Sequence, residues 1–97
     1  IVCDVSFISM KKVIYPTLSF LRKESGTVIG LIKPQFESEI KEIKKGGVIK
    51  DSAIHQRICN EYVNWFSDVC KMKVLGIIES PLRGPKGNIE FLICAKR

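Results

Sequence analysis

Three charged residues stand at the ends of apolar runs, where they could handle a proton. Asp4 lies at or near the end of the run over 1–5, Lys33 follows the run over 28–32, and Glu90 falls at the start of the run over 89–95. Two carboxylates can orient a lysine amine, and an amine that has lost its proton can accept one from a hydroxyl group. A purely structural cluster of ion pairs uses the same residue types, so both interpretations stay open.

The segment around Lys33 favours a site at the end of a strand. Pro34 follows directly, and proline stops a strand because it has no N–H to donate to the sheet. In open α/β sheets, ligands bind just beyond the carboxyl ends of the strands. A lysine at a strand end can also simply mark the point where the chain meets water. The role of Asp4 is equally open, because helix caps and turns use aspartate just as functional sites do.

The first half of the chain predicts a strand, a helix and a second strand. The run over 1–5 suits a buried parallel strand, and Ser9 can cap a helix that ends at Gly26. Pro16 should kink that helix. The apolar face of the helix recurs at helical spacing and consists of Met10, Val13, Ile14, Leu18 and Leu21. The run over 27–32 is the second strand, and a right-handed crossover makes the two strands parallel.

The second half of the chain begins with a predicted polar loop over 38–50, followed by a helix that Asp51 caps. A parallel strand over 74–79 comes next. A turn-rich loop over 81–88 then leads into an antiparallel last strand over 89–95. The helix carries an apolar stripe, which we interpret as core rather than as a base-stacking surface: Ile54, Ile58, Tyr62, Trp65, Phe66 and Val69. We expect His55 to be a surface residue.

The predicted fold is therefore α/β, with three parallel strands, an antiparallel last strand and two main helices. Its strand directions bring Asp4, Lys33 and Glu90 to one edge of the sheet. Two basic loops flank that edge and could hold phosphate groups, through Lys44, Lys45, Arg83 and Lys86.

The bulk composition sets further limits. Ninety-seven residues make one small domain, and the net charge of +6 favours an anionic partner, either nucleic acid or an acidic membrane. No run approaches the roughly 20 apolar residues of a membrane span, and no signal peptide is visible, so we expect a cytoplasmic protein. The four cysteines form no C-x-x-C pair and there is one histidine, which argues against a metal site and for free thiols. The chain opens inside a strand-like run, as a piece of a larger protein would.

Five motifs in order resemble the carboxyl half of the TlyA family. They are Asp4-Val5-Ser6-Phe7-Ile8-Ser9, Lys33-Pro34-Gln35-Phe36-Glu37, Gly46-Gly47-Val48 followed by Asp51, Ser80-Pro81, and Gly84-Pro85-Lys86-Gly87-Asn88 followed by Glu90-Phe91. The resemblance runs essentially from end to end. Members of this family are described both as haemolysins and as ribosomal RNA 2′-O-methyltransferases with an FtsJ-like (RrmJ-like) domain.

The resemblance implies a Rossmann-like methyltransferase that uses S-adenosylmethionine and acts on ribosomal RNA or a ribosomal subunit. Such enzymes have a seven-stranded sheet and a Lys-Asp-Lys-Glu tetrad. Asp4 matches the tetrad aspartate, Lys33 the second lysine and Glu90 the glutamate. By similarity, Lys33 would help to deprotonate the ribose 2′-hydroxyl, and Asp4 with Val5 would contact the cofactor.

The resemblance also implies that parts of the enzyme are missing from these residues. The first tetrad lysine, the glycine-rich cofactor loop, the first three strands and an S4-like RNA-binding domain would all precede Ile1, and no G-x-G-x-x-G pattern occurs in the sequence. Residues 1–97 would be a partial FtsJ-like domain that neither binds the cofactor tightly nor methylates RNA alone. Its exposed edge over 1–5 could pair with another copy. Two alternatives remain, a membrane-active haemolysin and a non-catalytic RNA-binding module that uses only the basic edge.

Overall fold

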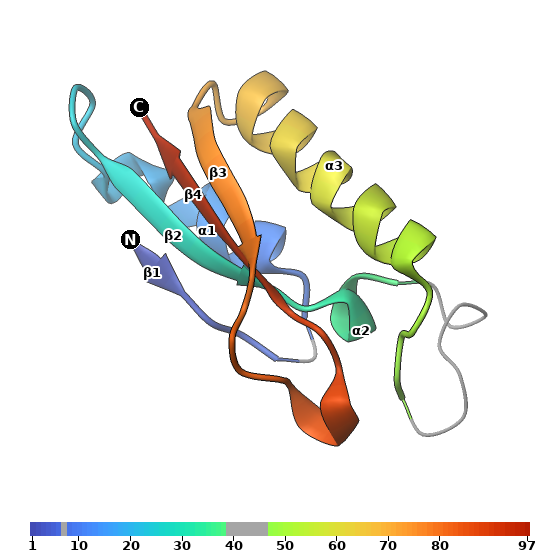
Figure 1. The fold of residues 1–97 in the computed structure, drawn as a ribbon. Helices are drawn as coiled ribbons and strands as arrows, with labels where there is room; N and C mark the ends of the chain where they lie inside the picture. Colours follow the sequence, from blue (N-terminus) through green and yellow to red (C-terminus); the bar gives the residue numbers. More distant parts are fainter. Residues whose placement is uncertain (7, 39–46) are drawn as a thin grey trace.

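Strands and helices share the chain, as expected for an α/β protein. A computed structural model describes residues 1–6, 8–38 and 47–97. In chain order the elements are β1 (Val2–Cys3), α1 (Met10–Thr17), the 3-10 turn η1 (Leu18–Phe20), β2 (Thr27–Ile32), α2 (Pro34–Glu37), α3 (Ser52–Asp68), β3 (Lys73–Glu79), the 3-10 turn η3 (Pro85–Gly87) and β4 (Phe91–Lys96) (Figure 1). Residues 39–46 of the predicted polar loop over 38–50 lie outside the described residues.

The strands form one four-stranded sheet in the order β1-β2-β4-β3. β1 is parallel to β2, and β4 is antiparallel to both β2 and β3. The sequence predicted β4 as the hairpin partner of β3, but it did not predict that β4 would also pair with β2. That second pairing matters because Ile32 and Glu79, the last residues of β2 and β3, both lie opposite Phe91.

The carboxyl ends of the three like-directed strands therefore meet the start of β4 at one end of the sheet. We call this end the rim and define it as residues 4–6, 33–35 and 80–90. In Figure 1 the rim is the lower end of the molecule, where the loops after β1, β2 and β3 gather. The rim is the edge at which Asp4, Lys33 and Glu90 were expected to lie.

α1 begins where the sequence predicted. Ser9 has an extended backbone, and its hydroxyl accepts a hydrogen bond from the N–H of Lys11 at 3.3 Å. This satisfies one of the N–H groups that a helix start leaves unpaired. Met10 and Ile14 are buried and turn the apolar face of α1 onto the sheet.

The end of α1 differs from the prediction, which continued the helix to Gly26. The α-helix ends at Thr17, and the chain tightens into η1. Pro16 lies in this last turn and has no N–H for the carbonyl four residues back, and the N–H of Leu18 bonds to the carbonyl of Tyr15, three residues back, as in a 3-10 turn. Leu18 is nevertheless buried, so the apolar spacing identified a packed residue but not the helix boundary.

α3 packs as the aromatic stripe predicted. Asp51 caps it by accepting a hydrogen bond from the N–H of Ala53 at 2.8 Å. Tyr62 and Phe66 are fully buried in the same core as α1, which confirms that they are packing residues. Val69 was predicted to join this face, but it follows the helix and is half exposed.

His55 is buried, and the prediction of a surface histidine was wrong. Its side chain is only 6% exposed, and its Nε2 lies 3.0 Å from the carbonyl oxygen of Ile49. A carbonyl can only accept, so this ring nitrogen is the donor. The ring also meets Phe91 edge to face, with 5.6 Å between centroids. The segment before α3 and the start of β4 together cover it.

Glu37 ties α2 to both longer helices. Its Oε1 accepts hydrogen bonds from the hydroxyl of Tyr62 on α3 and, at 3.2 Å, from the N–H of Met10 on α1. Burial raises the pKa of Tyr62, and the hydrogen bond to Glu37 raises it further. Because α2 follows Lys33 directly, these contacts also fix the point where the chain leaves β2.

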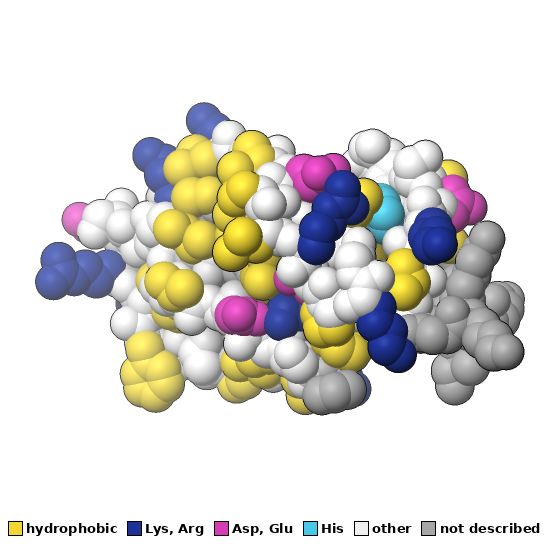
Figure 2. Space-filling view, turned by 60° about the horizontal axis from the view of Figure 1, so that its bottom comes forward, with side chains coloured by type: hydrophobic (Ala, Val, Ile, Leu, Met, Phe, Trp, Pro, Cys, Tyr) yellow, Lys and Arg dark blue, Asp and Glu magenta, His cyan; other side chains and the backbone are white. Residues whose placement is uncertain are grey.

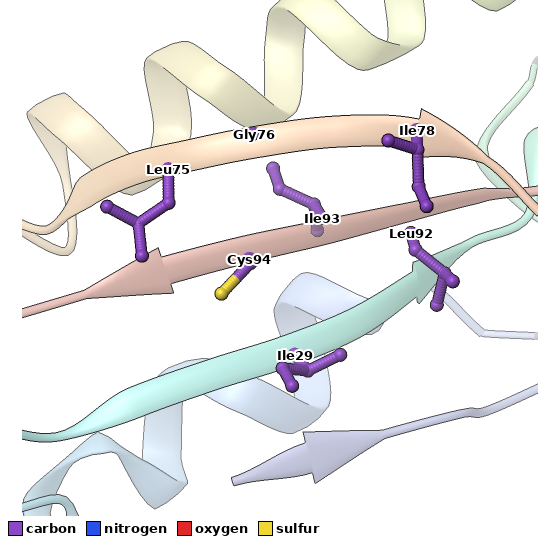
Figure 3. Close-up of a pocket in the computed structure, with 7 residues that line it drawn as sticks. All are labelled: Ile29, Leu75, Gly76, Ile78, Leu92, Ile93 and Cys94. Atoms are coloured by element: carbon purple, nitrogen blue, oxygen red, sulfur yellow. The ribbon is translucent and has the colours of Figure 1, made fainter.

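The sheet has one covered and one open face. Both longer helices contribute to a single core on one face, while in the described part of the chain the other face carries exposed apolar side chains. Figure 3 shows Ile29, Leu75 and Ile78 on this open face, where they line a shallow groove of about 280 Å³. A buried strand over 1–5 was therefore wrong: β1 has two residues, and Val2 is 81% exposed.

All four cysteines are free. Burial raises the pKa of the Cys3, Cys59 and Cys70 thiols. Among the described residues, no helix combines the length and the apolar character that crossing a bilayer requires.

Candidate functional site

Lys33 and Asp4 meet at the rim. Lys33 is the last extended residue before α2, and Pro34 opens the helix directly after it. Its ammonium lies 2.6 Å from Asp4 Oδ1 and donates to Ser6 Oγ at 3.1 Å. The lysine side chain is only 11% exposed, whereas that of Asp4 is 64% exposed. The cation is therefore held in a confined position beside a carboxylate that solvent can reach.

The neighbourhood of this pair affects the thiol of Cys3. Burial is the main cause that raises its pKa, the adjacent Asp4 carboxylate raises it further, and the Lys33 ammonium partly opposes the rise. Cys3 is thus a neutral packing residue at neutral pH, although it precedes Asp4 directly.

Glu90 lies at the same rim but is not paired with Lys33. Its carboxylate is buried, at 6% exposed, and its Oε2 accepts a hydrogen bond from Gln35 Nε2 at 2.8 Å. Among the described residues, no ion pair joins Glu90 to Lys33. The structure thus brings Asp4 and Lys33 together and connects Glu90 to the Lys33 segment through Gln35.

Gly84 leaves the space that the Glu90 carboxylate occupies. A Cβ placed at Gly84 would collide with the carboxylate group of Glu90 and press on the amide of Gln35. The loop between β3 and β4 therefore comes close to the Glu90 side chain, and a larger residue at this position would displace the carboxylate from its place beside Gln35.

The β3–β4 loop presents two of the four predicted RNA-binding residues. Arg83 and Lys86 are both exposed, and Lys86 has a positive φ of 59°. Lys44 and Lys45 lie outside the described residues. Figure 2 views the molecule from the rim side, with Lys and Arg side chains (dark blue) spread among Asp and Glu side chains (magenta).

Asn88 anchors this loop. It is 2% exposed, and its amide nitrogen donates to the carbonyl oxygens of Gly47 at 2.9 Å and Pro85 at 3.0 Å. Its amide oxygen accepts from the N–H of Ile49 at 2.9 Å. One side chain therefore joins the β3–β4 loop to the segment that leads into α3.

Val5, the other predicted cofactor contact, is half-buried and packs against the core. Its side chain is a packing group, which leaves its backbone for any contact with a ligand.

The sequence did not identify Ser6, Gln35 or Asn88 as site residues. All three lie inside the motifs quoted above, two of them at short spacing from a predicted residue: Ser6 follows Asp4 by two positions, and Gln35 follows Lys33 by two. Ser6 lies in the non-helical segment after β1, where residues two apart can point to the same side, so its spacing from Asp4 was a usable signal. Gln35 lies in α2, so its spacing from Lys33 gave no such signal. No local signal marks Asn88, because its partners come from a distant segment.

The whole chain, residues 1–97, matches the model of the FtsJ-like methyltransferase family. It is 40% identical to Hemolysin A of Brachyspira hyodysenteriae over 95 residues, which cover 95% of this chain and 38% of that protein. It is 31% identical over 99 residues to the 16S/23S rRNA (cytidine-2′-O)-methyltransferase TlyA of Mycobacterium tuberculosis, covering 96% of this chain and 34% of that protein.

Solved structures show the same similarity. A crystal structure of a Lactococcus lactis protein described as a hemolysin superposes with a TM-score of 0.89 at 35% identity, over 98% of this chain and 44% of that one. A Streptococcus thermophilus protein described in the same way gives a TM-score of 0.83 at 38% identity, over 99% of this chain and 34% of that one. The chain thus spans less than half the length of these relatives. It belongs to the FtsJ-like methyltransferase family.

Proposed function

We propose that this chain is the carboxyl-terminal part of a Rossmann-like domain that methylates the 2′-hydroxyl of ribose in ribosomal RNA, with S-adenosylmethionine as the methyl donor. The single observation that supports this most strongly is the Lys33 ammonium held between Asp4 Oδ1, at 2.6 Å, and Ser6 Oγ, at 3.1 Å. It lies beyond the carboxyl ends of like-directed strands, in a chain that matches the FtsJ-like family throughout.

In this proposal Lys33 handles the proton of the attacking hydroxyl. The Lys33 amine accepts the 2′-hydroxyl proton as the oxygen becomes the nucleophile, and the ammonium that forms lies 2.6 Å from Asp4 Oδ1. Asp4 stabilises this charge and keeps the amine at the rim. Ser6 adds an acceptor that fixes where the remaining N–H groups point.

Glu90 has a different role in the same proposal. Its buried carboxylate has a neutral amide as partner, and a buried charge is costly unless a cation compensates it. We propose that Glu90 receives the family's other lysine, presented at the rim by a part of the polypeptide other than these residues. Gln35 would then position the carboxylate for that lysine.

The residues present do not form a complete site for S-adenosylmethionine. The sequence has no G-x-G-x-x-G loop, and Asp4, the expected cofactor contact, is paired with Lys33. We therefore assign the handling of the proton and the positioning of the ribose to this chain.

The exposed Arg83 and Lys86 on the β3–β4 loop are proposed contacts to RNA phosphates, together with Lys44 and Lys45. Replacing Arg83 or Lys86 by alanine should weaken binding to all RNA sequences alike. Each change should also reduce the slope of log affinity against log salt concentration by about one. Work on ribosomal RNA would place the protein in the cytoplasm.

The hemolysin name of several relatives raises the alternative of direct membrane lysis. A lytic segment must leave the fold to lie in a bilayer. The apolar faces of α1 and α3 are both packed in the one core of the described chain. The open sheet edge at β1 is instead a proposed surface for pairing with another copy. Sedimentation as a strict monomer at high concentration would contradict that pairing.

The test of the proposed function uses the full-length polypeptide that contains this sequence. Labelled methyl groups are followed from S-adenosylmethionine into 16S and 23S rRNA, and nuclease digestion identifies 2′-O-methylated nucleosides. Lys33→Ala should lower the rate at least about 100-fold, the lower range for loss of an acid–base group, with RNA affinity little changed. Lys23→Ala, at an exposed lysine outside the rim, is the matched control.

Two results would contradict the proposal. Full methylation by Lys33→Ala would show that Lys33 does not handle the proton. If the intact protein binds RNA, never methylates it, and loses affinity when Arg83 is replaced, the protein is a non-catalytic RNA-binding module.

A further inference from the structure

A second cavity lies beside the rim, on the face of the sheet that the helices cover. Its volume is about 260 Å³. The first two turns of α3 form one wall, with Ser52, His55 and Gln56, and the opposite wall consists of Ile89 and Phe91. Glu79, the last residue of β3, lines it as well, so the cavity opens at the same end of the sheet as the candidate site.

The cavity and Glu90 share one short piece of chain. Ile89 and Phe91 line the cavity, and Glu90 between them directs its carboxylate to Gln35. Neighbouring side chains of an extended segment point in opposite directions, which explains this division. A molecule in the cavity would therefore lie one residue away from a proposed catalytic carboxylate, without touching it.

Several lining groups are hydrogen-bond acceptors. His55 Nε2 donates to the carbonyl of Ile49, which leaves Nδ1 as the ring nitrogen that can accept a hydrogen bond. Gln56 donates through its Nε2 to Asn60 at 3.4 Å, which leaves its amide oxygen to accept. The Glu79 carboxylate accepts as well. These groups suit a ligand that donates N–H bonds, and the carboxylate disfavours a phosphate inside the cavity.

The remaining walls are apolar and include the ring of Phe91, which already meets His55 edge to face. A flat ring with amino groups on its edge satisfies both kinds of wall, because its faces are apolar and its edge donates. Outside the cavity, the exposed Arg83, Lys86 and Lys50 supply positive charge at the same end of the molecule. A chain of phosphates could follow these cations while one base turns inward.

We propose that this cavity holds the base of a nucleotide next to the one that is methylated, and that it prefers a base with an exocyclic amino group. This inference rests on the proposed RNA substrate. It adds a base-reading subsite, built from α3 and the start of β4, to a rim that otherwise contacts ribose and phosphate.

The experiment measures binding of single-stranded RNA nonamers of adenylate, cytidylate and uridylate to the full-length polypeptide by fluorescence anisotropy. Uridine lacks the amino group, so the adenylate or the cytidylate nonamer should bind about fivefold or more tighter than the uridylate one, within the range for one base-reading contact. Ser52→Trp, at an exposed position on the cavity wall, should remove that preference by filling the space. Glu79→Gln should reduce it while keeping the volume.

Asn64→Trp, an exposed position three turns further along α3, is the matched control and should keep the preference. Equal affinity for the three nonamers, or a preference that survives both Ser52→Trp and Glu79→Gln, would overturn the subsite. Methylation of rRNA by the same preparations separates the two proposals. An active enzyme without base preference refutes only the cavity assignment, whereas a base preference without any methylation refutes the proposed function.

Discussion

At the scale of single residues, the polar side chains of the rim form separate groups rather than one cluster. Lys33 is held by Asp4 and Ser6, while Glu90 is held by Gln35. Lys33 and Gln35 are two positions apart, so one short segment with Pro34 at its centre positions both the cation and the buried carboxylate. A change in the path of this segment would therefore disturb both halves of the site together.

Asn88 offers a direct test of how the β3–β4 loop is held. Asn88→Ala removes bonds to the Gly47, Pro85 and Ile49 backbone and leaves buried polar groups without partners, so the free energy of unfolding should fall by about 2–3 kcal/mol. Urea denaturation measures this. Asn60→Ala, at an exposed asparagine on α3, should cost about 0.5 kcal/mol or less. Equal losses in the two variants would contradict an anchoring role for Asn88.

The residues whose position in the fold could be predicted from the sequence are those at strand ends. Asp4 and Lys33 follow apolar runs, and chain direction alone brought them to one edge. The partners of Glu90 and Asn88 could not be predicted, because Gln35 is 55 positions from Glu90 and Gly47 is 41 positions from Asn88. Such pairings follow from how β4 inserts between β2 and β3, which no local pattern encodes.

At the scale of elements, α2 is the shortest α-helix among the described residues and connects α1 with α3. Glu37 at its end bonds to α1 through the Met10 N–H and to α3 through Tyr62. The limits of β2 were predictable because a β-branched run is bounded by Gly26 and Pro34. The end of α1 was not, because tertiary packing of Leu18 continued the apolar spacing beyond the last α-helical residue.

Tyr62, which joins α3 to α2, should make the free energy of unfolding depend on pH in the alkaline range. Its pKa is raised in the folded protein, so the unfolded chain loses the phenolic proton first. The stabilisation is complete below the unfolded pKa of about 10 and is lost as pH rises above it, by about 1.4 kcal/mol per pH unit for one proton. The raised thiol pKa values of Cys3, Cys59 and Cys70 add to the loss from about pH 8.5 upward.

The measurement is the free energy of unfolding by denaturant between pH 8 and pH 11. Tyr62→Phe should lower the free energy of unfolding at neutral pH, because the bond to Glu37 is lost. It should also make that free energy fall less steeply with alkaline pH, by the contribution of one proton. Tyr15→Phe, at an exposed tyrosine, is the control for removing a phenol. An unchanged slope in Tyr62→Phe would contradict the assigned role.

At the scale of the whole molecule, the described residues form a core on one face of the sheet and leave an apolar face open on the other (Figure 3). The chain spans 38% of Hemolysin A and 34% of TlyA. Composition and strand order could indicate the fold class. They could not show that one face of the sheet is open, because an apolar residue on that face has the same sequence signature as one in the core.

The residues 1–97 alone should not bind S-adenosylmethionine tightly, because they supply the amine and carboxylates of the rim but no glycine-rich loop for the cofactor. Isothermal titration calorimetry on the isolated chain should show no saturation at micromolar cofactor. The full-length polypeptide is the control and should bind. Micromolar affinity of the isolated chain would refute this division of roles.

The central claim is that Asp4 and Lys33 act as one unit in proton handling, and a double-mutant cycle in the full-length polypeptide tests it most directly. Single-turnover methylation of rRNA is measured for Asp4→Asn, Lys33→Ala and the variant with both changes. If the 2.6 Å pair is the working unit, each single change should slow methyl transfer at least about 100-fold, and the double variant should be little slower than Lys33→Ala alone. Losses that multiply in the double variant would contradict the claim, because they would show two residues that act independently.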